Sequence, residues 1–296
     1  MFMISIIQSD ESKILFNTFY RNLLAGQIEK YPVPGKFKLA KNQLFPDKNT
    51  VFDWVCDKKS SGIWIPWINS IETSSMATTK IDDLFIYTSD NAMQMYFLKL
   101  WFQDQQPSLI LGPPGNGKTA TMLHYLSHLP TDKYISNIIN LSHYTSAENV
   151  QEMIMSKIDR RRKGVYGPSM GKKIILAFDD FERSVNSEST ENIVELLRQL
   201  LERKFWYDSK EACRVELIDF LFTGAMAPPT NRAKSLFLRF VHHVNIIPSK
   251  PLNETIASSI FSGVLEKHLS NNGFSLQICQ LSQVGNCTLQ NIHSII

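Results

Sequence analysis

The sequence predicts an α/β protein in which a mainly parallel sheet is covered by helices on both faces. From about residue 80, short apolar segments typical of strands alternate with segments that have helical spacing. A glycine-rich loop joins one of these strands directly to the helix that follows it. Such alternation is typical of parallel sheets, because each strand must return through a crossover before the next one begins. The predicted strands are 108–112, 136–142, 173–178 and 216–224, and the predicted helices lie near 119–128, 147–162 and 190–203.

The regions on either side of this alternation are less regular. Residues 11–27 have apolar side chains at helical spacing, whereas residues 28–50 are rich in Pro, Lys and Asn and indicate a linker. Next comes an aromatic cluster that we expect to be a docking surface, formed by Phe52, Trp54, Trp64 and Trp67. After Pro248 a helix is predicted over 252–269, and residues 276–296 show no clear period.

Composition is that of a globular protein. The chain has 296 residues, 43% hydrophobic and 20% charged, enough for one large core or two modest ones. The formal charge of +3 is too small to favour a nucleic-acid partner, and no apolar run reaches membrane-spanning length. The four cysteines lack C-x-x-C spacing and indicate free thiols. We therefore expect a soluble cytoplasmic protein with neither a nucleic-acid nor a membrane partner.

One basic run stands out, Arg160-Arg161-Arg162-Lys163 followed by Gly164. It is compatible with a nucleic-acid contact. The interpretation we favour is the solvated end of the helix predicted over 147–162, where cations interact well with the helix dipole.

Residues 112–119 fit the phosphate-binding pattern G-x-x-x-x-G-K-[ST] at every fixed position. The candidate nucleotide-binding residues are Gly112, Pro113, Pro114, Gly115, Asn116, Gly117, Lys118 and Thr119. The glycines let the backbone turn so that successive N–H groups point at phosphate oxygens, and the following helix N-terminus favours anions. Lys118 adds positive charge, and the Thr119 hydroxyl is a candidate Mg²⁺ ligand. The pattern predicts a site for ATP or ADP with Mg²⁺.

A second apolar strand ends in two carboxylates, Asp179 and Asp180. In P-loop enzymes such a strand lies beside the loop strand, and its first carboxylate holds Mg²⁺ through water, a role that Asp179 fits. The next residue polarises the attacking water and is most often Glu. Asp180 is therefore a candidate catalytic residue, but its side chain is one methylene shorter than that of glutamate. An error of about 1 Å can cost on the order of a hundredfold in rate, so binding is better supported than fast hydrolysis.

These residues and their flanks resemble the third AAA+ module of dynein heavy chains, closest to the axonemal type, over roughly residues 11–275. The matching segments are Phe52-Asp53-Trp54, Trp64-Ile65-Pro66-Trp67, Tyr144-Thr145-Ser146-Ala147, Gln151–Lys157, Arg161–Pro168, Met170–Lys173, Glu195–Gln199, Trp206-Tyr207-Asp208, Ala225-Met226 and Arg239-Phe240. The resemblance implies an inter-module segment with the Trp-rich docking region (1–79), an AAA+ nucleotide-binding large domain (80–249) and the start of a helical lid (250–275). The residues without a clear period form an irregular tail (276–296).

The resemblance also implies a role for Arg239. This residue matches the arginine that reaches the nucleotide of a neighbouring module, and the functional interpretation is an arginine finger. The structural alternative, a buried arginine of the core, is about equally compatible with the sequence. Expected partners are neighbouring AAA+ modules or other dynein subunits, with microtubules reached only through a complete heavy chain. The expected location is the cytoskeleton of the ciliary axoneme.

Several departures from the family pattern weaken catalysis more than fold. The lid stops after one helix, and Ala227 stands where many AAA+ proteins have a polar sensor. The sequence therefore leaves hydrolysis open. We expect an ATP-binding dynein module in a regulatory role, with slow or absent turnover. The alternative is a degenerate module that serves only as a structural or partner-binding surface, and an autonomous remodelling enzyme has little support.

Overall fold

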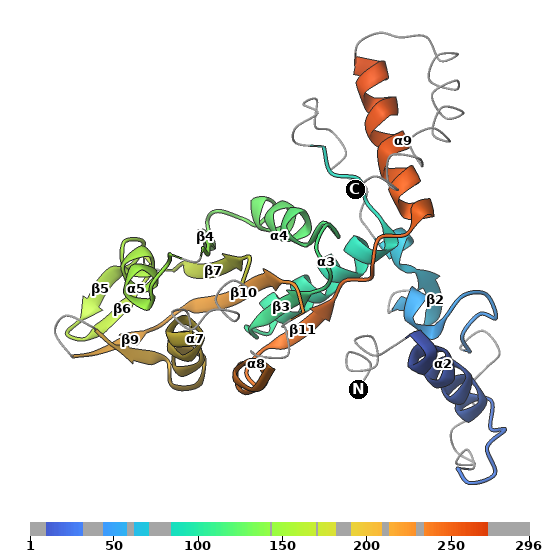
Figure 1. The fold of residues 1–296 in the computed structure, drawn as a ribbon, viewed down its shortest axis with the longest axis horizontal. Helices are drawn as coiled ribbons and strands as arrows, with labels where there is room; N and C mark the ends of the chain where they lie inside the picture. The colour runs from blue at the N-terminus through green and yellow to red at the C-terminus, as the bar shows by residue number, and fades with distance from the viewer. Residues whose placement is uncertain are drawn as a thin grey trace. The chain divides into compact units, whose positions relative to one another are not determined.

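The computed structural model describes residues 10–31, 44–57, 62–70, 84–142, 144–169, 171–181, 191–208, 213–228 and 234–271. The chain divides into two compact units. One is formed by Gln94–Pro251, and the other by Met1–Met93 together with Leu252–Ile296. The predicted tail over 276–296 lies outside the described residues. Figure 1 labels the helices and strands of both units.

A five-stranded sheet forms the centre of the Gln94–Pro251 unit, with the strand order β11-β3-β10-β7-β4. Its strands are β3 (Ser108–Leu111), β4 (Tyr134–Asn140), β7 (Lys173–Asp179), β10 (Phe220–Met226) and β11 (Asn245–Pro248). Every neighbouring pair is parallel, which confirms the predicted α/β class. Buried residues line strand β3 and most of β7 and β10, as expected where both faces are covered.

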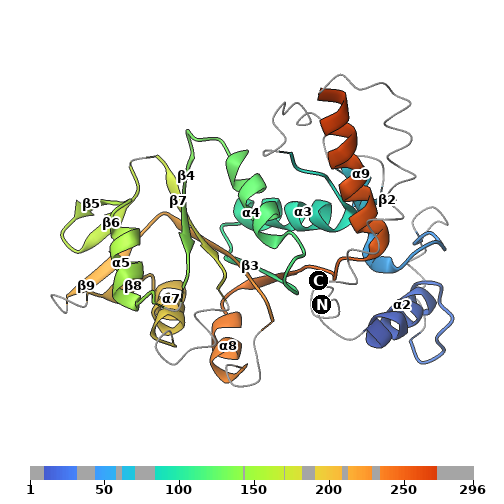
Figure 2. The same cartoon turned by 45° about the horizontal axis from the view of Figure 1, so that its top comes forward.

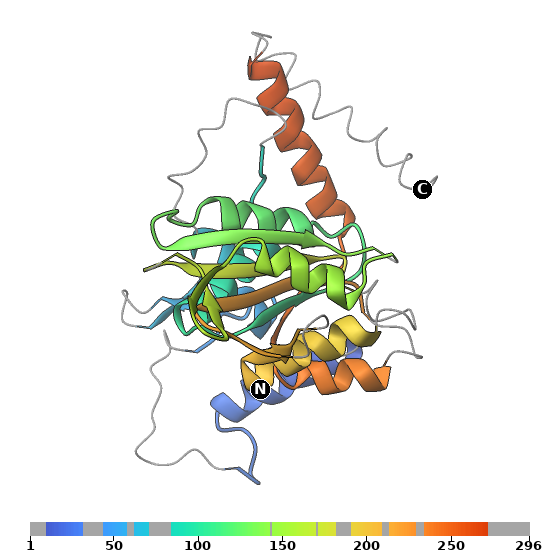
Figure 3. The ribbon, with the colours of Figure 1, turned by 90° about the vertical axis from the view of Figure 1, so that its left-hand side faces the viewer.

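Helices cover the two faces of this sheet. They are α3 (Ser89–Gln103), α4 (Lys118–Ser127), α5 (Ala147–Met155), α7 (Glu191–Arg203) and α8 (Lys234–Val241). Figures 2 and 3 show α4 on one side of the sheet and α7 with α8 on the other. The helix over 89–103 was not predicted.

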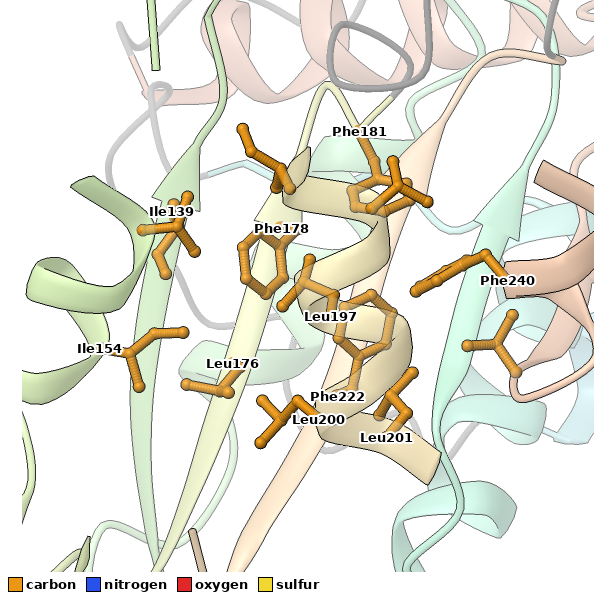
Figure 4. Close-up of a cluster of buried hydrophobic side chains, with 14 of the residues drawn as sticks. Ile139, Ile154, Leu176, Phe178, Phe181, Leu197, Leu200, Leu201, Phe222 and Phe240 are labelled. Carbon is orange, nitrogen blue, oxygen red and sulfur yellow. The ribbon is translucent and has the colours of Figure 1, made fainter. Parts of the chain in front are cut away.

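The main hydrophobic core lies between the sheet and the helices α5, α7 and α8 (Figure 4). Four phenylalanine rings form its centre: Phe178, Phe181, Phe222 and Phe240. The ring centroids of Phe178 and Phe222 are 5.4 Å apart, and those of Phe181 and Phe240 are 5.0 Å apart. Removing one such buried ring typically costs about 3–5 kcal/mol. Phe181 follows the acidic pair directly, so this core fixes the chain just beyond Asp180.

A second, four-stranded sheet has the order β5-β6-β9-β8. Its strands are β5 (Asp159–Arg162), β6 (Val165–Gly167), β8 (Phe205–Tyr207) and β9 (Arg214–Leu217). The helix predicted over 147–162 is therefore wrong in its second half, because α5 ends at Met155 and a β-hairpin follows. The prediction of a single strand over 216–224 is also wrong, because this range contains the end of β9 and the start of β10. A left-handed residue, Asp219 at φ 56°, separates β9 from β10.

The basic run consequently does not end a helix, contrary to the favoured interpretation. Arg160, Arg161 and Arg162 belong to strand β5, and Lys163 begins the turn into β6. Gly164 in that turn has φ 75°, a conformation that glycine adopts without strain.

The other unit contains α2 (Asp10–Leu24), the short helices η2 (Val51–Asp53) and η3 (Trp67–Ser70), the antiparallel pair β1 (Trp54–Asp57) and β2 (Ile63–Pro66), and α9 (Glu254–Asn271). Phe45, Val51 and Phe52 form a small core against which Trp54 and Trp64 pack. Trp67 is buried, and its indole N–H donates to the Phe52 carbonyl at 2.8 Å. These tryptophans thus pack largely within their own segment. Exposed apolar side chains in this unit include three on α2, namely Ile14, Leu15 and Phe19.

Two further observations concern helices. Helix α9 begins with a capping contact, because the Asn253 side chain accepts the N–H of Ile256 at 2.9 Å. Within the described residues, no helix combines the length and the hydropathy needed to cross a membrane.

Candidate nucleotide-binding site

The glycine-rich loop connects the C-terminal end of β3 to the first turn of α4 (Figure 1). Gly115 and Gly117 have φ values of 79° and 73°, so both lie in the left-handed region that favours glycine. A Cβ built on either of them meets nothing within 4 Å, so open space borders the loop at both glycines. The loop therefore has the backbone conformation and the space to let N–H groups face a phosphate.

Gly112 is required for a different reason. A Cβ on Gly112 would lie 2.6 Å from Ser249 Cβ and 2.7 Å from the Ser249 carbonyl oxygen. The Ser249 N–H also donates to the Leu111 carbonyl at 2.8 Å. The start of the loop is thus held against the chain that follows β11.

A second contact joins the loop to the same segment. The side-chain amide of Asn116 donates to the carbonyl of Lys250. Four residues later the chain enters α9 at Glu254. Sequence reasoning missed this contact, because Asn116 occupies a variable position of the loop pattern and Lys250 belongs to no motif.

The loop lysine and threonine begin helix α4. Lys118 Nζ donates to the Pro113 carbonyl at 2.7 Å, so the ammonium lies over the loop itself. Thr119 Oγ1 donates to Asp179 Oδ1 at 2.8 Å. Pro114 is exposed at the outside of the loop. The structure therefore brings Lys118, Thr119 and Asp179 together at one end of the sheet.

Strand β7 supplies Asp179, but it does not lie beside the loop strand as expected. β10 separates β3 from β7 and pairs with both of them. The carboxyl ends of parallel strands share one edge of the sheet, so Asp179 still reaches the first turn of α4.

Asp180 lies at the end of the same strand in a left-handed conformation, with φ 52°. It is exposed, whereas Asp179 is half-buried and Phe181 is fully buried. The N–H of Phe181 donates to the Ala225 carbonyl at 3.1 Å, which fixes the turn. Aspartate tolerates this conformation better than most residues.

Arg239 occupies helix α8, on the face of the sheet opposite to α4 (Figures 2 and 3). Its side chain is 64% exposed, so the alternative of a buried structural arginine is wrong. Arg239 Nη2 lies 3.8 Å from Glu195 Oε1. Arg198 donates to both oxygens of Glu195, and this hydrogen bonding, with the charges of Arg198 and Arg239, lowers the Glu195 pKa. The structure does not bring Arg239 to the loop of its own module.

The site has the donors that Mg²⁺ prefers. The hydroxyl of Thr119 and the carboxylate of Asp179 are hard oxygen ligands, and they face each other at hydrogen-bonding distance. The residues present therefore fit a nucleotide with its magnesium ion. Together the sheet, the loop and the acidic strand end define a P-loop nucleotide-binding protein.

Comparison with known proteins identifies the family. The family model for the P-loop containing dynein motor region matches residues 73–251, and that for the dynein heavy chain AAA lid domain matches residues 5–69. The chain is 36% identical to dynein axonemal heavy chain 3 of Homo sapiens over 278 residues, which is 93% of this chain and 7% of the relative. It is 32% identical to dynein axonemal heavy chain 12 of Rattus norvegicus over 272 residues, which is 90% of this chain and 9% of the relative.

The chain belongs to the dynein heavy chain family. It spans less than a tenth of the length of these curated relatives. The large unit is a P-loop AAA module of the dynein motor, and nucleotide binding follows from that class. The N-terminal segment matches the lid domain of the family, a more specific assignment than the inter-module segment expected from sequence.

Proposed function

We propose that this chain is the ATP-binding third AAA+ module of an axonemal dynein heavy chain. In this proposal the module regulates a microtubule-based motor by its nucleotide state, and hydrolysis is slow or absent. The hydrogen bond between Thr119 and Asp179 is the observation that supports it most, because it joins the two side-chain oxygens that fit the Mg²⁺ ligands of a P-loop site.

The proposed roles follow from the geometry of the loop. The backbone N–H groups of residues 112–117 bind the phosphates, and the α4 N-terminus adds its dipole. Lys118 exchanges its contact with the Pro113 carbonyl for the phosphate oxygens, which are the stronger acceptors. Thr119 and Asp179 hold Mg²⁺, which neutralises phosphate charge when it is bound.

Slow hydrolysis is proposed on two observations. Asp180 has a short carboxylate at an exposed, left-handed position, which makes it a poor match for a residue that orients water. Helix α9 contains no arginine over Glu254–Asn271, so this helix lacks a candidate for the lid arginine that usually contacts the terminal phosphate. Arg239 is proposed to act on the nucleotide of a neighbouring module, as its exposure on α8 allows.

The proposed partners are the other AAA+ modules of a complete heavy chain and other dynein subunits. The proposed location is the axoneme, in keeping with the axonemal relatives. Microtubule contact would be indirect. The competing proposal, a degenerate structural module, is favoured by the lack of an arginine in α9 and disfavoured by the intact loop.

Equilibrium binding of a fluorescent ATP analogue with Mg²⁺ separates these proposals. We expect saturable binding that Lys118→Ala reduces at least tenfold, since charge-assisted hydrogen bonds contribute about 1.5–3 kcal/mol each. Lys133→Ala, at an exposed lysine outside the loop, is the matched control and retains full affinity. Equal affinity of the Lys118→Ala variant and the wild type would remove the proposed site.

A further inference from the structure

Strand β5 and the turn after it form a basic edge, defined here as Arg160, Arg162 and Lys163. All three side chains are exposed, and none has a carboxylate oxygen within 4.0 Å among the residues that the structure describes. In the same unit, by contrast, Arg198 contacts both Glu195 and Glu202. Clustered cations without partners repel one another, so this arrangement lowers stability unless something else neutralises it.

The basic edge also lies at the border of its sheet. β5 is the first strand in the order β5-β6-β9-β8, so among the strands that the structure describes none pairs with its outer N–H and C=O groups. Edge strands are commonly protected from other chains by short length, bulges, prolines or charged side chains, lysine above all. The basic edge carries three exposed cations, of which two are arginines rather than lysines. An arginine fork binds a carboxylate with two hydrogen bonds.

The hairpin is held rigidly. Ile158 and Val165, at the two ends of the basic run, are buried in the main core of the unit. Arg161, the remaining arginine of the run, donates to the Pro168 carbonyl. Gly167 packs so closely that a Cβ there would lie 2.9 Å from the Ile218 side chain. A partner would therefore meet a preformed edge and lose little affinity to ordering it.

We propose that the basic edge is a docking site for an extended acidic segment of a protein. The segment adds to the sheet beside β5 and pairs its carboxylates with Arg160, Arg162 and Lys163. A polypeptide fits better than a nucleic acid, because an extended polypeptide presents N–H and C=O groups at the same spacing as the edge of a strand. This site is independent of the nucleotide loop and of the proposed function.

Fluorescence anisotropy with the full chain of 296 residues tests the proposal. The probe is a labelled peptide of four Glu-Val repeats, whose carboxylates lie on one face when it is extended. We expect saturable binding that weakens with added NaCl. The double substitution of Arg160→Gln with Arg162→Gln should weaken peptide binding about tenfold or more, since each charge-assisted hydrogen bond that is lost contributes substantially to the binding free energy. Lys99→Gln with Lys133→Gln removes the same charge at exposed lysines elsewhere and should leave affinity within twofold.

Two further arms decide the class of partner. A peptide of the same sequence with N-methylated backbone should bind at least tenfold more weakly, because it cannot pair with the strand. Single-stranded RNA of matched charge should bind more weakly than the Glu-Val peptide. The proposal is overturned if the control pair of substitutions loses as much affinity, if N-methylation has no effect, or if the RNA binds more tightly.

Discussion

Thr119 Oγ1 donates a 2.8 Å hydrogen bond to Asp179 Oδ1, although the two residues are 60 positions apart in the sequence. Thr119 lies in the first turn of α4 and Asp179 ends β7. Each is a hard oxygen donor, and Mg²⁺ prefers such ligands. The contact therefore joins the loop and the acidic strand end into one candidate metal site.

The first prediction concerns Asp179→Asn. Asparagine keeps the shape of the side chain and an oxygen that can still accept from Thr119, but it removes the negative charge. We expect the Mg²⁺ dependence of ATP-analogue binding to be largely lost while the fold is retained. A titration of Mg²⁺ at fixed analogue measures this. Asp132→Asn, at an exposed aspartate outside the site, is the control. An unchanged Mg²⁺ midpoint in the Asp179 variant would refute the proposed metal role.

The second prediction concerns Asp180 and the rate of hydrolysis. We expect slow turnover in the wild type, and expect Asp180→Glu to raise the rate more than Asp180→Asn lowers it. Glutamate restores the missing methylene, but at φ 52° it is less well accommodated than aspartate or asparagine. The Asp180→Glu variant should therefore gain rate and lose some thermal stability. Phosphate release and thermal unfolding measure the two effects, and a wild-type rate near the enzyme median of ~10 per second would contradict the prediction.

The third prediction compares two glycines of the loop. Gly112→Ala places a methyl group 2.6 Å from Ser249 Cβ and 2.7 Å from its carbonyl oxygen, and buried backbone cannot move aside easily. We expect a loss of about 1–3 kcal/mol in the free energy of unfolding, typical of overpacking. Gly115→Ala meets no atom within 4 Å and is strained only by its φ of 79°, at about 1–2 kcal/mol.

Urea unfolding of the two glycine variants measures these losses in the free energy of unfolding. Gly112→Ala should also weaken binding of the ATP analogue, because the start of the loop must move away from Ser249. If Gly112→Ala were as stable as the wild type, the close approach of the loop to the chain after β11 would be wrong.

The features predicted well from sequence are those set by local pattern. The loop glycines, Lys118 and Thr119 are consecutive, so a single motif defines their geometry. The apolar strand before Asp179 is long and uninterrupted, and α/β alternation predicted it as a parallel strand, although not its separation from β3 by β10. Membership of the dynein family followed from many short segments that match together.

The failures arise where a few residues or distant contacts decide the structure. Strand β6 has only three residues, and the basic run before it has no period that separates helix from strand. A single left-handed residue, Asp219, divides β9 from β10. The contacts of Asn116 with Lys250 and of Arg239 with Glu195 depend on tertiary packing. No local signal in the sequence reports them.

The last prediction concerns pH and the helix that follows the loop. His124 on α4 has a lowered pKa, first because it is partly buried and second because His128 lies beside it, with ring centroids 4.3 Å apart. The folded state therefore disfavours protonated His124, whereas the unfolded chain takes up the proton near the ordinary value of about 6.5. The associated stability is fully present above that value and is lost as the pH falls below it toward the folded pKa.

We expect the melting temperature of the wild type to fall between pH 7 and pH 5.5, and His124→Gln to flatten this fall because glutamine takes up no proton. His242→Gln, at an exposed histidine of the same unit, should leave the profile unchanged. Melting temperatures across this range test the prediction with the wild type and the two variants side by side. Parallel profiles for the wild type and His124→Gln would show that protonation of His124 does not destabilise helix α4.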